Sequence, residues 1–214
     1  MRSSGEMAPG AAPRRFRFGT RSLTLAPMLA GLMLLALSST VGAQTVLPQG
    51  GNLVSGQARI LAPSANSLTI TQNSSKAIVN WDSFSVGPTG SVNFVQPNAA
   101  AAILNRVTGS TASTIAGQLN ANGQVFLVNP NGIAITSTGA VQVGGGFVAS
   151  TLDIGNADFN AGNLSFAGNG ASASVSNAGS IASAPGGFVG LIGGTVSNSG
   201  TIRVPLGRVG LGSG

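Results

Sequence analysis

The sequence predicts an all-β fold in which short strands stack as a parallel β-helix, or solenoid. From Gln44 onward, glycine, serine, threonine and asparagine recur every few residues, and apolar residues alternate with polar ones as in half-buried strands. No stretch keeps the three- and four-residue apolar spacing of an amphipathic helix for long. A repeat of about 20 residues near the C-terminus indicates that the strands are stacked in coils.

The repeat is clearest in residues 175–181 (VSNAGSI), which match residues 196–202 (VSNSGTI) at an offset of 21. Leucine-rich repeats have a similar length, but their leucine scaffold and asparagine position are missing here. Short Val and Ile strands between Gly, Asn and Pro turns fit one coil of a β-helix instead. Two asparagines at equivalent positions, Asn177 and Asn198, either form a hydrogen-bonded ladder between coils or lie in solvent-facing turns.

Residues 1–43 are expected to be a cleaved signal peptide. Arginines through Arg21 precede an apolar segment of residues 23–37, and small residues precede the expected cut between Ala43 and Gln44. A transmembrane anchor is the competing interpretation, but the apolar segment contains a proline and a glycine and is shorter than the roughly 20 residues that a spanning helix needs. We therefore expect the general secretion machinery and signal peptidase to process the chain.

The composition argues against nucleic acid as a partner. The chain has 10 basic and 4 acidic residues, a formal net charge of +6, but half of the basic residues lie in the leader. The other basic residues are scattered singly, so there is no basic stripe along which phosphates could bind. Cysteine is absent, so strand pairing and apolar packing must hold the protein together without disulfides.

A cap is expected over residues 44–80, before a β-helix that occupies residues 81–214. A bare first coil would offer its backbone edge to other chains, so that edge has to be covered. Trp81 and Phe84 flank the transition, where packing explains them better than recognition does. Within and just after the cap, strands are expected at residues 58–61, 67–71 and 77–81. Further on, the alanine run of residues 99–104 could form either a turn of helix or a loop between strands.

The central landmark is the stretch of residues 123–133, GQVFLVNPNGI. Strand-forming residues run to Val128, and the turn-forming residues Asn129-Pro130-Asn131-Gly132 follow directly. One strand is therefore expected to end at Val128 and the next to begin at Ile133. The side chains expected to face the interior are Val125, Leu127, Ile133 and Ile135.

With its neighbours, this stretch resembles the N-terminal secretion domain of the filamentous haemagglutinin family, the large exoproteins of two-partner secretion systems. The matching neighbours are SVNFVQP (residues 91–97), ILNRVTG (103–109) and GGGFVAST (144–151). The resemblance implies a right-handed parallel β-helix with an N-terminal cap, exported through a dedicated outer-membrane β-barrel transporter. It also implies a secreted or cell-surface adhesin that passes through the periplasm of a Gram-negative bacterium.

In the family, the Asn-Pro-Asn-Gly element belongs to the region needed for export, which implies that the transporter recognises Asn129, Pro130, Asn131 and Gly132. In isolation, the same four residues are an ordinary turn. Some members carry a second Asn-Pro-Asn element upstream, whose nearest counterpart here is Gln96-Pro97-Asn98. Members normally continue with further coils and a long effector or adhesive region. We therefore expect a fragment or truncated product, with any contact to host or neighbouring cells made by the missing region.

Catalysis is not expected, and neither is a cofactor or a metal site. Histidine and cysteine are absent, which excludes imidazole bases, thiol nucleophiles and the usual zinc clusters. The alternative function is a β-helical polysaccharide-processing enzyme in which Asp153 and Asp158 form a carboxylate pair. No neighbouring cation or aromatic sugar platform is apparent beside them. The glycines at 144–146 lack the lysine and hydroxyl of a phosphate loop and are better explained as a turn.

Overall fold

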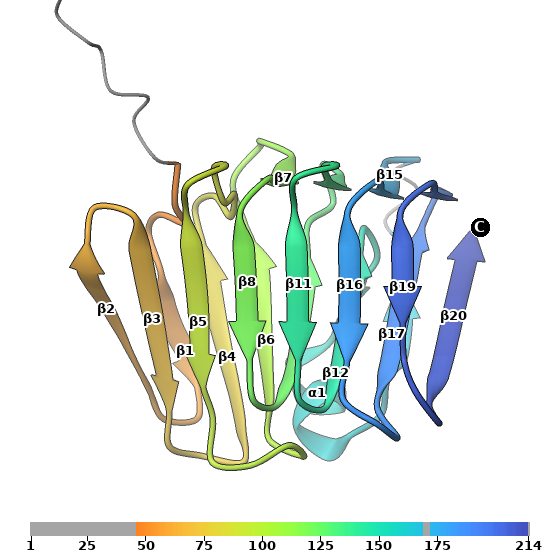
Figure 1. Ribbon diagram of the computed structural model, residues 1–214. Helices are drawn as coiled ribbons and strands as arrows, with labels where there is room; N and C mark the ends of the chain where they lie inside the picture. Colours follow the sequence, from red (N-terminus) through yellow and green to blue (C-terminus); the bar gives the residue numbers. More distant parts are fainter. Residues whose placement is uncertain (1–45, 169–171, 214) are drawn as a thin grey trace, which may run out of the picture. The chain divides into compact units, whose positions relative to one another are not determined.

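The computed structural model describes residues 46–168 and 172–213. These residues belong to one compact unit, Val41–Gly214. The expected signal peptide and the cleavage site between Ala43 and Gln44 lie outside the described residues. Within the described part, strands are stacked coil upon coil, as Figure 1 shows.

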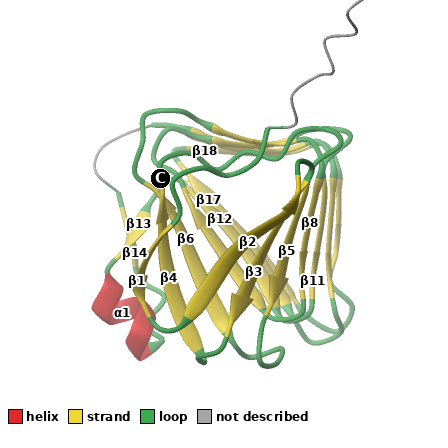
Figure 2. Cartoon of the chain, turned by 90° about the vertical axis from the view of Figure 1, so that its left-hand side faces the viewer, coloured by secondary structure: helices red, strands yellow, loops and turns green. Residues whose placement is uncertain are grey.

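Three sheets run along the stack, and they enclose the core (Figure 2). The first sheet contains, in spatial order, β1 (Asn52–Ser55), β4 (Lys76–Trp81), β6 (Ala102–Val107), β9 (Gln124–Val128), β12 (Gly146–Ser150), β17 (Phe188–Gly193) and β20 (Arg208–Ser213). The second contains β19 (Thr201–Arg203), β16 (Ser180–Ser183), β11 (Ala140–Val143), β8 (Gln118–Ala121), β5 (Ser91–Val95), β3 (Ser67–Gln72) and β2 (Ala58–Ser64). The third contains β18 (Thr195–Asn198), β15 (Ser174–Asn177), β10 (Ile133–Ile135) and β7 (Ser113–Ile115).

From β3 onward, every pairing between neighbouring strands of these three sheets is parallel. This arrangement confirms the expected parallel β-helix. The predicted repeat also lies in register, with Val175 opposite Val196 and Ile181 opposite Ile202. The Nδ2 of Asn177 donates to Oδ1 of Asn198 over 2.7 Å, so the two asparagines form the ladder that was one of the two expectations.

The antiparallel strands β1 and β2 cover the start of the stack. β1 pairs with β4, and β2 pairs with β3, each through an irregular register. Such bulges, together with Pro63 in β2, protect an edge against pairing with other chains. Parallel pairing already begins with β3 and β4, so the first coil starts inside the range expected for the cap.

Apolar side chains stack in rows inside the coils. One row runs through Ile103, Val125, Phe147 and Val189, which lie opposite one another in β6, β9, β12 and β17 and are at most 2% exposed. Val125, Leu127, Ile133 and Ile135 all belong to this core, as predicted. One coil buries too little apolar surface to offset its own ordering entropy, so the rows stabilise each coil through its neighbours.

Other local expectations have mixed outcomes. Trp81 and Phe84 are buried with their rings perpendicular at 5.5 Å, which confirms that they are packing residues. The alanine run forms a turn and then enters β6 at Ala102, so no helix forms there. Gly144 and Gly145 connect β11 to β12, as expected for a turn, and Gly146 is already the first residue of β12.

A helix that was not expected, α1 (Asn156–Ala161), lies outside the first sheet beside the short antiparallel pair β13 (Asp153–Ile154) and β14 (Phe166–Ala167) (Figure 2).

Candidate functional site

The Asn129–Gly132 turn connects β9 in the first sheet to β10 in the third. β9 ends at Val128 and β10 begins at Ile133, as predicted. The Gly132 amide donates to the Asn129 carbonyl over 3.1 Å and closes a β-turn with Pro130 at its second position. Gly132 has φ +114°, a conformation that side-chain-bearing residues rarely adopt.

Asn129 is buried, and its carboxamide is fully hydrogen-bonded. Its Nδ2 donates to the Thr111 carbonyl (2.9 Å) and to Ser113 Oγ (2.8 Å). Its Oδ1 accepts from the backbone amide and from Nδ2 of Asn131, at 2.9 and 3.0 Å. The side chain therefore joins the turn to the preceding coil while it shapes the turn itself.

Pro130 and Asn131 form the accessible part of the turn. Asn131 is exposed, although its Nδ2 also donates to the Gly109 carbonyl over 2.8 Å. Pro130 is half-buried and borders a hollow of about 360 Å³. The other residues that line this hollow are Arg106, Val107, Thr108, Val128, Thr151, Asp153 and Ala167.

A second buried amide lies at the Gln96-Pro97-Asn98 element, and its structural role was not predicted. Gln96 is 5% exposed, and its Nε2 donates to Gln72 Oε1 and to the Ala101 carbonyl, both at 3.0 Å. Its Oε1 accepts from the Gly123 amide at 2.9 Å. Gln96 and Asn129 thus both place a buried carboxamide just before a proline, where it ties one coil to its neighbours. The sequence signal for this shared role is the pattern of a carboxamide residue followed by Pro-Asn, which occurs at both places.

Residues 44–214 match the family model for the TPS secretion domain, where TPS stands for two-partner secretion. The chain belongs to this family. The matched residues include the buried carboxamides of Gln96 and Asn129 and the whole Asn129–Gly132 turn.

Relatives and a solved structure agree with this assignment. The chain is 44% identical over 108 and 107 residues to two heme/hemopexin-binding proteins of Haemophilus influenzae, one of them from strain Rd. These matches cover 50% of this chain but only 12% and 11% of the relatives. The crystal structure of the HMW1 secretion domain from Haemophilus influenzae is similar with a TM-score of 0.74 and 39% identity, over 78% of this chain and 45% of that one.

Residues 44–214 are therefore the TPS secretion domain of a two-partner secretion exoprotein. Exoproteins of this kind are secreted from Gram-negative bacteria or exported to their surface, and the TPS domain implies an outer-membrane transporter as the partner. The family serves secretion, and none of the relatives named here supports the polysaccharide-processing alternative.

The carboxylates considered for catalysis have other surroundings in this TPS domain than the sequence suggested. Asp153 accepts a hydrogen bond from Arg106 Nε over 2.8 Å, so the expectation that no cation lies beside it was wrong. Asp158 lies in the first turn of α1.

Among the residues that the structure describes, no three His, Cys, Asp or Glu side chains are grouped to hold a metal ion. No helix in that part of the chain is long and apolar enough to cross a membrane.

Replacing Gly132 by alanine should destabilise the TPS domain through backbone strain. A Cβ would lie 3.3 Å from the Ser174 carbonyl oxygen, a slightly tight contact that a small shift relieves, and φ +114° is disfavoured for alanine. We expect the free energy of unfolding in urea to fall by about 1–3 kcal/mol. Gly210→Ala is the matched control, because a Cβ there meets nothing within 4 Å and its stability should stay near that of the parent. Equal melting curves for both variants would contradict the strain explanation.

Proposed function

We propose that the TPS domain addresses the exoprotein to one dedicated outer-membrane β-barrel transporter, and that Asn129, Pro130, Asn131 and Gly132 carry part of that address. The observation that supports this is the burial of the Asn129 carboxamide, whose hydrogen-bonding groups are all used inside the folded protein. A transporter could read that amide only in a chain that has not yet folded. An extended segment of this kind can bind by adding a strand to an existing sheet.

The two roles follow one another in time. While the chain is extended, the amides of Asn129 and Asn131 are free to pair with polar groups of the transporter. When the coil closes, the same amides bond to Thr111, Ser113 and Gly109, which removes them from the transporter. Folding outside the cell would therefore release the Asn129–Gly132 segment from the transporter and oppose return of the chain through it.

The route to the transporter belongs to the same proposal. Residues 1–43 serve as the signal peptide, signal peptidase cuts between Ala43 and Gln44, and the mature chain crosses the periplasm. The domain acts without catalysis, and an adhesive activity would reside in parts of the exoprotein other than the TPS domain. Heme and hemopexin binding is named for the two relatives, of which the matched stretch covers only 12% and 11%, so that binding belongs to those proteins.

Deletion of the transporter tests the proposal most directly. The protein is expressed in its own host with and without the gene for the neighbouring outer-membrane β-barrel transporter. With the transporter, we expect the protein outside the cells or on their surface, with an N-terminus at Gln44 by sequencing. Without it, the processed protein should remain in the periplasm. Unchanged export without any such transporter, or a mature chain that retains the apolar segment of residues 23–37, would contradict it.

A pair of variants separates an address from an effect on folding. Asn131→Ala removes an amide of the motif, whereas Ser113→Ala removes a hydrogen-bond partner of Asn129 that lies outside the motif. Ser113 is fully buried, so Ser113→Ala should lower the free energy of unfolding by about 1–3 kcal/mol, whereas Asn131 is exposed and Asn131→Ala should lower it by only about 0.5–1.5 kcal/mol. If the motif is read by the transporter, export of Asn131→Ala falls several-fold further than export of Ser113→Ala, although Asn131→Ala is no less stable. Export that follows stability alone in both variants would show that the turn acts only through the fold.

A further inference from the structure

The outer face of the first sheet is apolar, although the outer face of a solvated sheet is normally polar. Six side chains of four adjacent strands point outward on this face and are at most 4% exposed: Ile78, Ala102, Leu104, Phe126, Val128 and Val148. They form a cluster separate from the core inside the coils. Something must cover this face, because an exposed patch of this kind would favour association.

The cover is the segment of residues 151–167, which leaves the stack after β12 and contains β13, α1 and β14. Figure 2 shows α1 lying outside the first sheet, beside β1, β4 and β6. Phe159 of α1 is buried against Phe126, with ring centroids 5.3 Å apart and planes at 78°. Ile154 is buried in the same cluster, and Phe166 packs against it. We call this segment the clasp.

Lys76 of β4 anchors the end of α1. Its Nζ donates to the Phe159 carbonyl over 2.6 Å and lies 5.4 Å from the centroid of the Phe159 ring. The Phe159 carbonyl also accepts from the Gly162 amide at the end of α1. Carbonyls in the last turn of a helix carry partial negative charge, so an ammonium group stabilises them. This contact joins residues 83 positions apart in the chain.

Arg106 of β6 anchors the start of the clasp. Its Nε donates to Asp153 Oδ1 (2.8 Å), its Nη1 to Asn156 Oδ1 (2.9 Å) and its Nη2 to the Ile154 carbonyl (2.6 Å). Ser55 of the cap strand β1 provides a weaker contact, accepting from Asn160 Nδ2 at 3.3 Å. The clasp, which follows β12 in the chain, therefore contacts the earlier strands β1, β4 and β6.

We propose that the clasp is a conformational device that closes onto the first sheet only after the coils from β3 to β12 have stacked, with Lys76 and Arg106 as its anchors. The polar partners of the clasp in the cap and early coils lie 47 to 105 residues earlier, on different strands. The surface that it binds does not exist until those strands are adjacent. Alone, α1 is far too short to be stable, because isolated helices below about 12–15 residues are marginal in water.

The clasp thus distinguishes two folded states, one with the coils stacked and the apolar face open, and one with that face closed. This inference concerns the folded domain and does not depend on how the transporter reads the chain. An open clasp leaves the strand pairings of the coils intact, because none of them passes through residues 151–167. Thr151, the first residue of the clasp, donates its amide to the Ile192 carbonyl of β17 and can keep that bond while the rest of the clasp opens.

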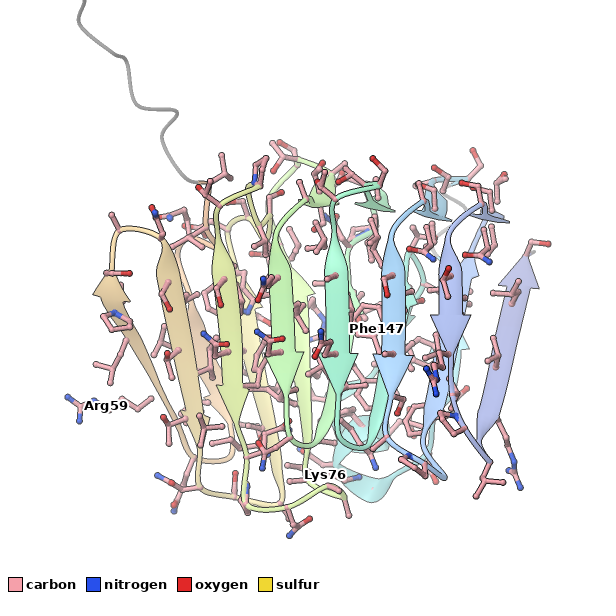
Figure 3. The ribbon with its side chains drawn as sticks, in the orientation of Figure 1. Arg59, Lys76 and Phe147 are labelled. Carbon is pink, nitrogen blue, oxygen red and sulfur yellow. The ribbon has the colours of Figure 1, made fainter. Side chains whose placement is uncertain are left out.

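Hydrogen exchange on the full chain can test the anchor role of Lys76. In Lys76→Met, the amides of Phe159, Gly162 and Asn163, which are bonded within the clasp, should exchange at least tenfold faster than in the parent. The amides of Gln124 and Asn129, which are bonded within the coils, should keep the parent rate. Arg59→Met is the matched control, because Figure 3 shows Arg59 projecting away from the sheets, whereas Lys76 lies beside α1. Its clasp amides should exchange as in the parent.

Two results would overturn the proposal: clasp amides that keep the parent rate in Lys76→Met, or clasp and coil amides that accelerate together. Should Lys76→Met fail to fold, pulse-labelled exchange during refolding of the parent decides the order without any substitution. We expect protection of Gln124 and Asn129 to precede protection of Phe159, Gly162 and Asn163. Simultaneous or reversed protection would show that the clasp is not a late and separable step.

Discussion

Asn129→Asp is expected to lower the free energy of unfolding by about 3–5 kcal/mol, a large part of the total stability of an ordinary domain. The replacement puts a carboxylate where Nδ2 now donates to the Thr111 carbonyl and to Ser113 Oγ. The new charge would be buried, would face a carbonyl oxygen and would have no cation within the turn. Urea denaturation followed by circular dichroism measures the loss.

Asn198→Asp provides the control for that result. Asn198 is exposed and accepts through Oδ1 from Asn177, an interaction that a carboxylate retains. Its unfolding free energy should stay within about 0.5 kcal/mol of the parent. If Asn129→Asp were as stable as Asn198→Asp, the buried amide would not be holding the coils together.

Ile181→Asp should have the other large effect. Ile181 of β16 is fully buried between Val141 and Ile202, so the carboxylate would be placed in the core without a partner. We expect a loss of about 4 kcal/mol or more, or failure to fold at 37 °C.

The same substitution at Ile202 isolates the contribution of burial. Ile202 is the register neighbour of Ile181 in β19 but is only partly buried, because it lies in the last described coil. Ile202→Asp should therefore cost about 1 kcal/mol, since the carboxylate can keep much of its hydration. Equal losses at both positions would contradict the gradient of burial along the stack.

The coils themselves were predictable because their signals are local. Alternating apolar residues and the turn residues after Val128 identify where strands begin and end, and the repeated asparagines indicate the register of the last coils. The direction of pairing is not local. Ser67–Gln72 has the alternation of any half-buried strand, so nothing in it shows that one neighbour, β2, is antiparallel and the other, β5, parallel.

The surroundings of the candidate site were harder to predict for the same reason. Arg106 and Asp153 are 47 residues apart, and only the stacking of β6, β9 and β12 brings them together. The six residues of α1 have no helical periodicity to detect, since the helix is stabilised by Phe126 and Lys76 rather than by its own sequence. The turn at Asn129 was recognisable from its residue types, but the burial of its carboxamide depends on Thr111 and Ser113 in another coil.

The clasp also changes how the domain should respond to a pulling force. In a stack of coils each contacts only its neighbours, so tension applied along the stack would peel the coils away one at a time. Ser55, Lys76 and Arg106 are tied to the segment that follows β12, so the coils between them cannot separate until those ties rupture. Under load, the part from β1 to β12 would therefore yield as one mechanical block. The coils from β15 to β20, which the described clasp contacts do not tie to the cap, would yield individually and at lower force.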